Sequence, residues 1–187
     1  LLLFSPAIGV SEFAALTNFA ALFAPVPGLG KAAWLDVMAE YDPYKYNSFP
    51  VNAGLQIWRL TRTLEEALAR AHAEGRLGRM PPVTAFQSLV DSTVAAADLV
   101  RRLFARLPAN GHELVVFDLN RNRVLSSLIA SGPTKEFDAL VAAPALPFRL
   151  AIVGSASEQT RDVDLRVREA GTRDAVAMPT GLAWPDN

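Results

Sequence analysis

The residue best placed to do chemistry is Asp91, within residues 82–94. A short apolar run over residues 83–86 predicts a strand, and Asp91 follows on the loop before a helix begins. In α/β proteins, ligands and reacting groups gather at the carboxyl ends of strands. An aspartate there could orient a histidine that activates a serine, as in an acid–histidine–serine triad.

The two other members of such a triad are not evident in the chain. The strict nucleophile turn G-x-S-x-G is absent because no two glycines stand four positions apart. Gly154-Ser155-Ala156 comes closest, but it leads toward another strand and is rejected. His72 lies on a charged helix and is expected at the surface. His112 begins a strand, which in a parallel sheet is the end opposite to Asp91.

A glycine-rich stretch, Gly28-Leu29-Gly30-Lys31-Ala32-Ala33, matches the dinucleotide pattern G-x-G-x-x-A. That pattern binds a pyrophosphate only where a strand leads into it and a helix starts within it. Here it follows a helix and Pro25-Val26-Pro27, so a plain turn is favoured. Nucleotide binding by the Gly28 loop is kept as the weakest alternative.

Composition narrows the classes of function. The 187 residues are 51% hydrophobic and 20% charged, which is typical of a packed globular protein. A net charge of −1 argues against nucleic acid as the main partner, and the lack of cysteine excludes disulfides and thiolate metal sites. The longest apolar stretch, residues 13–26, is too short to span a bilayer. We expect no metal, no cofactor and no transmembrane segment, and the compartment stays open.

The predicted elements define an α/β fold. Strands are expected over residues 1–5, 83–86, 113–117, 150–153 and 161–168, and helices over residues 11–24, 51–74 and about 91–107. This order predicts a partial, mostly parallel sheet flanked by helices. Residues 10–80 form an inserted helical cap, and residues 1–9 with 81–187 form the core. Because the sequence begins with an apolar run that is typical of a buried strand, we expect that a further segment of the protein precedes it.

Three segments together resemble the C-terminal portion of an α/β-hydrolase of the bacterial lipase or esterase type. Residues 1–7, Leu-Leu-Leu-Phe-Ser-Pro-Ala, resemble the strand that follows the nucleophile helix. Residues 82–94, with the pattern D-x-x-V from Asp91 to Val94, resemble the strand that carries the catalytic acid. Residues 112–118 resemble the last strand before the catalytic histidine, but no histidine follows them.

The resemblance implies a fragment of a serine hydrolase that acts on carboxylic esters, with a fairly apolar, lipid-like acyl substrate. Asp91 is then the triad acid, while the serine and histidine lie outside this chain. A companion N-terminal segment of the same protein, or a homodimer partner, is expected to complete the sheet. The alternative from another class is a non-catalytic α/β-hydrolase-like binding module. For Asp91 itself the alternative is a helix N-cap, and for residues 11–24 a buried core helix or a lid.

Overall fold

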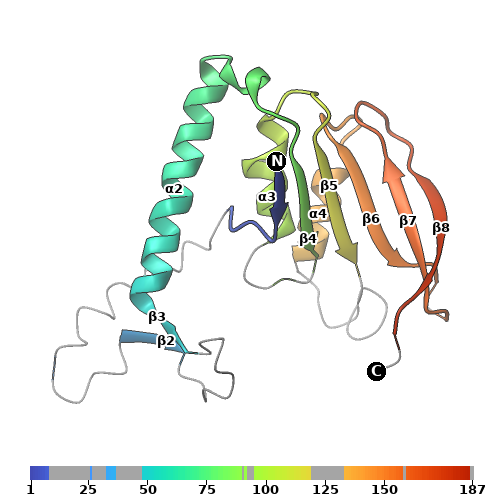
Figure 1. Ribbon diagram of the computed structural model, residues 1–187, viewed down its shortest axis with the longest axis horizontal. Coiled ribbons are helices and arrows are strands. Elements are labelled where there is room, and N and C mark those ends of the chain that lie inside the picture. The colour runs from blue at the N-terminus through green and yellow to red at the C-terminus, as the bar shows by residue number, and fades with distance from the viewer. Residues whose placement is uncertain are drawn as a thin grey trace. The chain divides into compact units, whose positions relative to one another are not determined.

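The computed structural model describes residues 1–8, 26, 33–36, 48–89, 91, 95–118, 133–157 and 159–185 (Figure 1). The chain divides into two compact units, one of Leu1–Ile8 with Ala67–Asn187 and one of Gly9–Glu66. The first unit holds a sheet and its core. The second holds a short pair of strands and most of the longest helix.

Six strands form one sheet in the first unit, in the order β1-β4-β5-β6-β7-β8. Their bounds are β1 Leu2–Phe4, β4 Thr84–Ser88, β5 Glu113–Asp118, β6 Arg149–Ser155, β7 Asp162–Arg168 and β8 Val176–Ala183. The first four are mutually parallel, and β7 and β8 each run antiparallel to the strand before them. The predicted α/β class is confirmed. The final two strands make the sheet mixed, and the cap stays a prediction.

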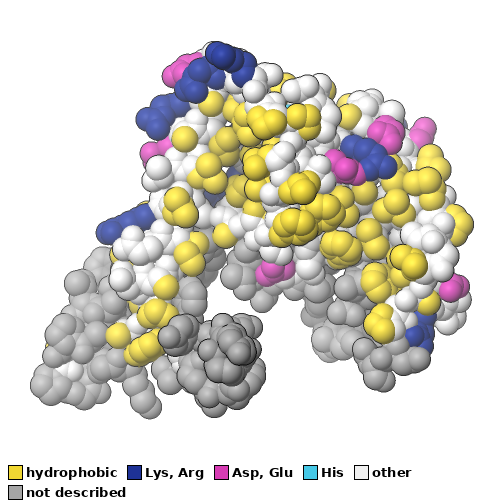
Figure 2. All heavy atoms as spheres, viewed as in Figure 1, with side chains coloured by type: hydrophobic (Ala, Val, Ile, Leu, Met, Phe, Trp, Pro, Cys, Tyr) yellow, Lys and Arg dark blue, Asp and Glu magenta, His cyan; other side chains and the backbone are white. Residues whose placement is uncertain are grey.

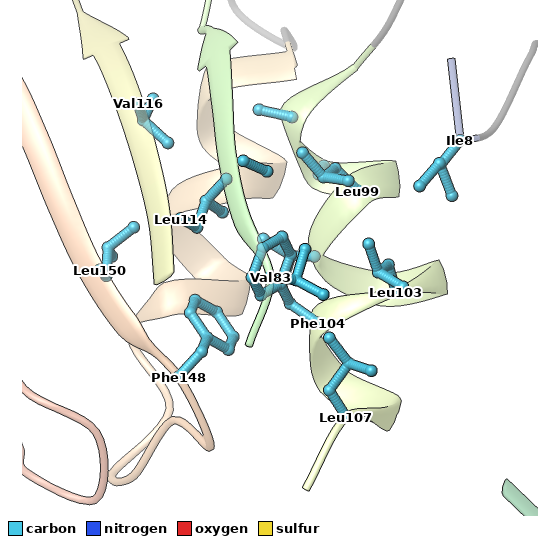
Figure 3. Packing of buried hydrophobic residues seen from close by; sticks show 14 of the residues in the cluster. Ile8, Val83, Leu99, Leu103, Phe104, Leu107, Leu114, Val116, Phe148 and Leu150 are labelled. Carbon is cyan, nitrogen blue, oxygen red and sulfur yellow. The ribbon is translucent and has the colours of Figure 1, made fainter. Parts of the chain in front are cut away.

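Two helices of this unit pack on the same face of the sheet. They are α3, Ala96–Arg102, continued by the short 3-10 helix η3, Phe104–Arg106, and α4, Pro133–Val141. The connections β4-α3-β5 and β5-α4-β6 step in the same direction across the sheet, and right-handed crossovers then place both helices on one side. Leu99 of α3 and its C-cap residue Leu103 pack beside Val83 and Leu114 (Figure 3). The ring of Phe104 meets that of Phe148 with centroids 4.9 Å apart.

The other side of the sheet, here called the second sheet face, carries two apolar rows. Residues paired in register on neighbouring strands point to the same side. The first row is Phe4, Phe86, Val115, Ala151, Val167 and Val176. The second begins at the polar Ser88 and continues with the apolar Phe117, Val153, Leu165 and Met178. Phe4 stacks on Phe86 with ring centroids 4.9 Å apart, yet is itself 71% exposed. Figure 2 shows hydrophobic side chains gathered over these strands.

The exposure of β1 departs from the sequence prediction of a strand buried on both faces. Leu2 is 65% exposed, whereas the intervening Leu3 packs against the core. β1 lies at the edge of the sheet, with β4 as its one neighbour in the sheet. The apolar run therefore meets the core on one side, and on the other side contributes to the second sheet face.

The second unit contains β2, Trp34–Asp36, paired antiparallel with β3, Phe49–Pro50. The helix α2, Val51–Ala73, begins in this unit and confirms the helix predicted over residues 51–74. Two residues after its end, Gly75 has a φ of +67°, the left-handed conformation that glycine adopts after a helix. The 3-10 helix η2, Arg76–Arg79, follows. The helix predicted over residues 11–24 lies outside the described residues.

Candidate functional site

Asp91 lies just beyond the carboxyl end of β4, in the parallel part of the sheet. Its backbone N–H donates to the carbonyl of Ser88, the last residue of that strand, at 3.4 Å. The N–H of Leu89 donates to the carbonyl of Phe117 in β5 at 2.9 Å, which ties the start of the loop to the neighbouring strand. The half-buried Asp91 side chain is thus held near the ends of β4 and β5.

Gln87 is a site residue that sequence reasoning missed. Its side chain is 1% exposed, and its Nε2 donates to the carbonyl of Ser88 at 3.2 Å and to Oδ2 of Asp91 at 3.4 Å. Along β4 it alternates with half-buried neighbours and is directed to the helix-covered side. The available signal was a polar residue, four positions before the acid, at a buried position of the strand.

The N-cap interpretation of Asp91 is wrong for the helix that follows. The structure starts α3 at Ala96, with Ala95 as the N-cap residue and no side-chain cap hydrogen bond. The prediction that Asp91 or Ser92 caps this helix placed its start several residues too early. A Ser or Asp before an apolar run is a common cap signal, but here Asp91 and Ala95 both lie outside the helix and Ala95 is its N-cap residue.

A second aspartate lies at the corresponding end of β5. Asp118 is buried and pairs in register with Gly154 of β6, which in turn pairs with Asp164 of β7. A methyl group at Gly154 would lie 3.3 Å from the Asp118 carbonyl oxygen and 3.6 Å from Nη2 of Arg166. Glycine therefore permits a close approach of backbone and guanidinium at this end of the sheet. One aspartate thus follows β4 and another ends β5.

The two histidines lie where the sequence predicted. His112 immediately precedes β5 and is 1% exposed, with its Nδ1 accepting a hydrogen bond from the Val83 N–H at 3.0 Å. Because β4 and β5 are parallel, this is the end of the sheet opposite to Asp91. His72 is exposed near the end of α2, with its Nδ1 3.1 Å from the Arg106 carbonyl oxygen. Neither histidine is positioned to pair with Asp91.

Ser155 is a structural residue, as its rejection as a nucleophile predicted. It ends β6, which continues into the antiparallel strand β7 instead of turning into a helix. Its Oγ accepts a hydrogen bond from Nε1 of Trp184 at 3.2 Å. A nucleophile turn would instead lift the hydroxyl at a sharp strand-to-helix connection.

Within the described ranges, no group of three or more His, Cys, Asp or Glu side chains is arranged to hold a metal ion. None of the described helices combines the length and apolar character needed to cross a bilayer. The Gly28 loop lies outside the described residues, so nucleotide binding there stays a sequence-based alternative.

Comparison with known proteins gives no relative from which a role could be transferred. No protein-family model, no curated protein and no solved structure matches the chain.

Proposed function

We propose that this chain is part of an α/β-hydrolase-type serine hydrolase that cleaves carboxylic esters with a fairly apolar acyl group. One observation carries the proposal: Asp91 follows the carboxyl end of β4, a strand flanked on both sides by parallel neighbours, β1 and β5. The order β1-β4-β5 agrees with the family order of strand after the nucleophile helix, acid strand and histidine strand.

In the proposed mechanism Asp91 accepts a hydrogen bond from Nδ1–H of a histidine, fixes its tautomer and stabilises the imidazolium. The histidine takes the proton of a serine hydroxyl as that oxygen attacks the ester carbonyl, and then delivers it to the leaving alkoxide. Backbone amides stabilise the oxyanion, and water releases the acyl group in the second half of the reaction. The serine, the histidine and the oxyanion hole come from outside these 187 residues.

The proposal also includes a second polypeptide layer on the second sheet face. A mostly parallel sheet is normally covered on both sides, and α3 and α4 cover one. The rows that begin at Phe4 and at Ser88 extend across β1 and β4 to β8. Within them Phe4, Val176 and Met178 are exposed and form an apolar surface, whereas Ala151 and Val167 are buried. We assign this surface to a companion N-terminal segment of the same protein. A homodimer would bury the same residues between two copies.

A non-catalytic binding module is the second candidate, and one observation favours it. The chain has two histidines, His72 and His112, so none follows Asp118 where a hydrolase of this type carries its catalytic histidine. A binding module would retain the fold and the strand-end aspartate without the reacting groups.

The deciding experiment is intact mass measurement of the purified protein under denaturing conditions, before and after a fluorophosphonate probe. The hydrolase proposal expects a second polypeptide that gains the probe mass. Asp91→Asn should lower ester hydrolysis by about 10³–10⁴-fold, the scale of losing a triad acid. The matched control Asp98→Asn, on α3, should leave hydrolysis unchanged. A complex that contains a companion polypeptide but is never labelled would favour the binding module.

A further inference from the structure

Gln87 is a buried primary amide at a position where packing alone favours an apolar residue. Its register neighbours on the helix-covered side of the sheet are Val116 of β5 and, one strand further, Ile152 of β6. Both belong to or pack against the apolar core. A buried amide costs free energy unless it is hydrogen-bonded. A leucine or methionine would continue the core at this point, so the amide needs an explanation.

The hydrogen bonds of Gln87 point to one end of the strand. A primary amide nitrogen carries two N–H donors, and both acceptors near Nε2 lack a hydrogen to donate: the Ser88 carbonyl at 3.2 Å and Oδ2 of Asp91 at 3.4 Å. The amide must therefore turn its nitrogen toward them. The Ser88 carbonyl also accepts from the Asp91 N–H, so one short loop holds all three groups.

We propose that Gln87 is a positioning residue that fixes the orientation of the Asp91 carboxylate. A fixed donor on Oδ2 restrains rotation of the carboxylate about its last side-chain bond. In the hydrolase, the carboxylate held in this way accepts the histidine Nδ1–H. This inference rests on the proposed function for its catalytic meaning, whereas the contact between Gln87 and Asp91 is testable without it.

Solution NMR of the full chain tests the contact directly. The Gln87 side-chain NH₂ pair, assigned through its own bonds, should shift on Asp91→Asn, because the amide loses a charged acceptor. The exposed Asp174→Asn serves as control and should leave the pair unmoved. An unchanged NH₂ pair in Asp91→Asn would overturn the proposal.

Kinetics of the protein purified with its companion polypeptide test the consequence. Gln87→Met keeps the length of the side chain and removes both donors, so kcat for ester hydrolysis should fall about tenfold with KM unchanged. A purely structural role would instead lower the melting temperature and the amount of folded enzyme without changing kcat per active site. Full kcat in a folded Gln87→Met enzyme would overturn the positioning role.

The two proposals fail separately. If the wild-type complex is neither labelled nor hydrolytic, the hydrolase function fails, and the NMR result still decides whether Gln87 holds Asp91. If hydrolysis is present and depends on Asp91 but not on Gln87, the function stands and the positioning role falls.

Discussion

Replacing Arg168 of β7 with methionine should lower the stability of the protein by a large amount for a single substitution. Arg168 is 7% exposed, and its guanidinium donates to three backbone carbonyls. Nε reaches the carbonyl of Thr172 at 2.7 Å, while Nη1 and Nη2 reach those of Val141 and Ala143. Val141 is the last residue of α4, so one side chain joins the helix end to the β7–β8 turn.

The expected magnitude follows from these contacts. A hydrogen bond with a charged donor contributes about 1.5–3 kcal/mol, and a cation at a helix C-terminus adds a favourable interaction with the helix dipole. The cost of burying the guanidinium offsets part of the gain from three such bonds. We expect a net loss of about 3 kcal/mol in the free energy of unfolding. For a chain of this size, that lowers the melting temperature by roughly 6–12 °C.

Thermal and urea unfolding followed by circular dichroism would measure the loss. The matched control is Arg166→Met, two residues earlier on the same strand, where the side chain is exposed and the change should stay within about 0.5 kcal/mol. The loss of stability in Arg168→Lys should lie between the losses in Arg168→Met and Arg166→Met, because one ammonium group cannot reach all three carbonyls with the same geometry. Equal melting temperatures for Arg168→Met and the wild type would refute the reasoning.

Three further outcomes are expected. Burial lowers the pKa of His112, so the folded state resists protonation of this side chain. The free energy of unfolding should therefore be constant above about pH 6.5 and should fall as the pH drops below that value. In urea titrations, His112→Gln should remove most of this pH dependence. Gly154→Ala should cost about 1 kcal/mol in thermal unfolding because its methyl group would crowd a backbone carbonyl of β5, whereas Gly78→Ala, with open space around it, should be near neutral. Phe4→Asp combined with Val176→Asp should weaken binding of the companion polypeptide, or of a second copy, by about tenfold or more in sedimentation experiments; unchanged association would move the interface away from the second sheet face.

The parallel part of the sheet was predictable because its strands are short, uninterrupted apolar runs. The run before Ser5 and the run after His112 each became a strand within a residue of the prediction, and the run after Pro82 became a strand that ends two residues later than predicted. The strand β7 was equally predictable, since charged and apolar residues alternate along it. The local sequence pattern is sufficient to predict a strand where a segment is either continuously apolar or strictly alternating.

The strand β8 was missed because its sequence contradicts strand preference. Pro179 and Gly181 lie inside it, and both residues are usually read as turn signals. Every residue of β8 is exposed, so no apolar alternation marks it. β8 is a strand because it pairs with β7, and such pairing cannot be predicted from the sequence of β8 alone.

The position of Asp91 just after a strand could be predicted, but the inward orientation of Gln87 could not. The aspartate follows a strand and precedes a helical segment, which is a positional signal. Whether a polar residue inside a strand points to water or to the core depends on which helices cover which face. That is fixed by the register with β5 and by the packing of α3. The helix start was misplaced because cap residues occur in ordinary loops as well.

The position of β1 at the edge of the sheet has a consequence for the order of folding. The hydrogen bond from the Ser5 N–H to the Phe86 carbonyl joins residues 81 positions apart, whereas the bond between Val83 and His112 spans 29. Closing the longer loop costs more chain entropy, so β1 should dock after β4 and β5 have paired. At about 5–20 residues per second, synthesis across these 81 positions takes roughly 4–16 s. Until then β1 cannot pair with β4, which makes this apolar strand a segment of the nascent chain on which a chaperone would act.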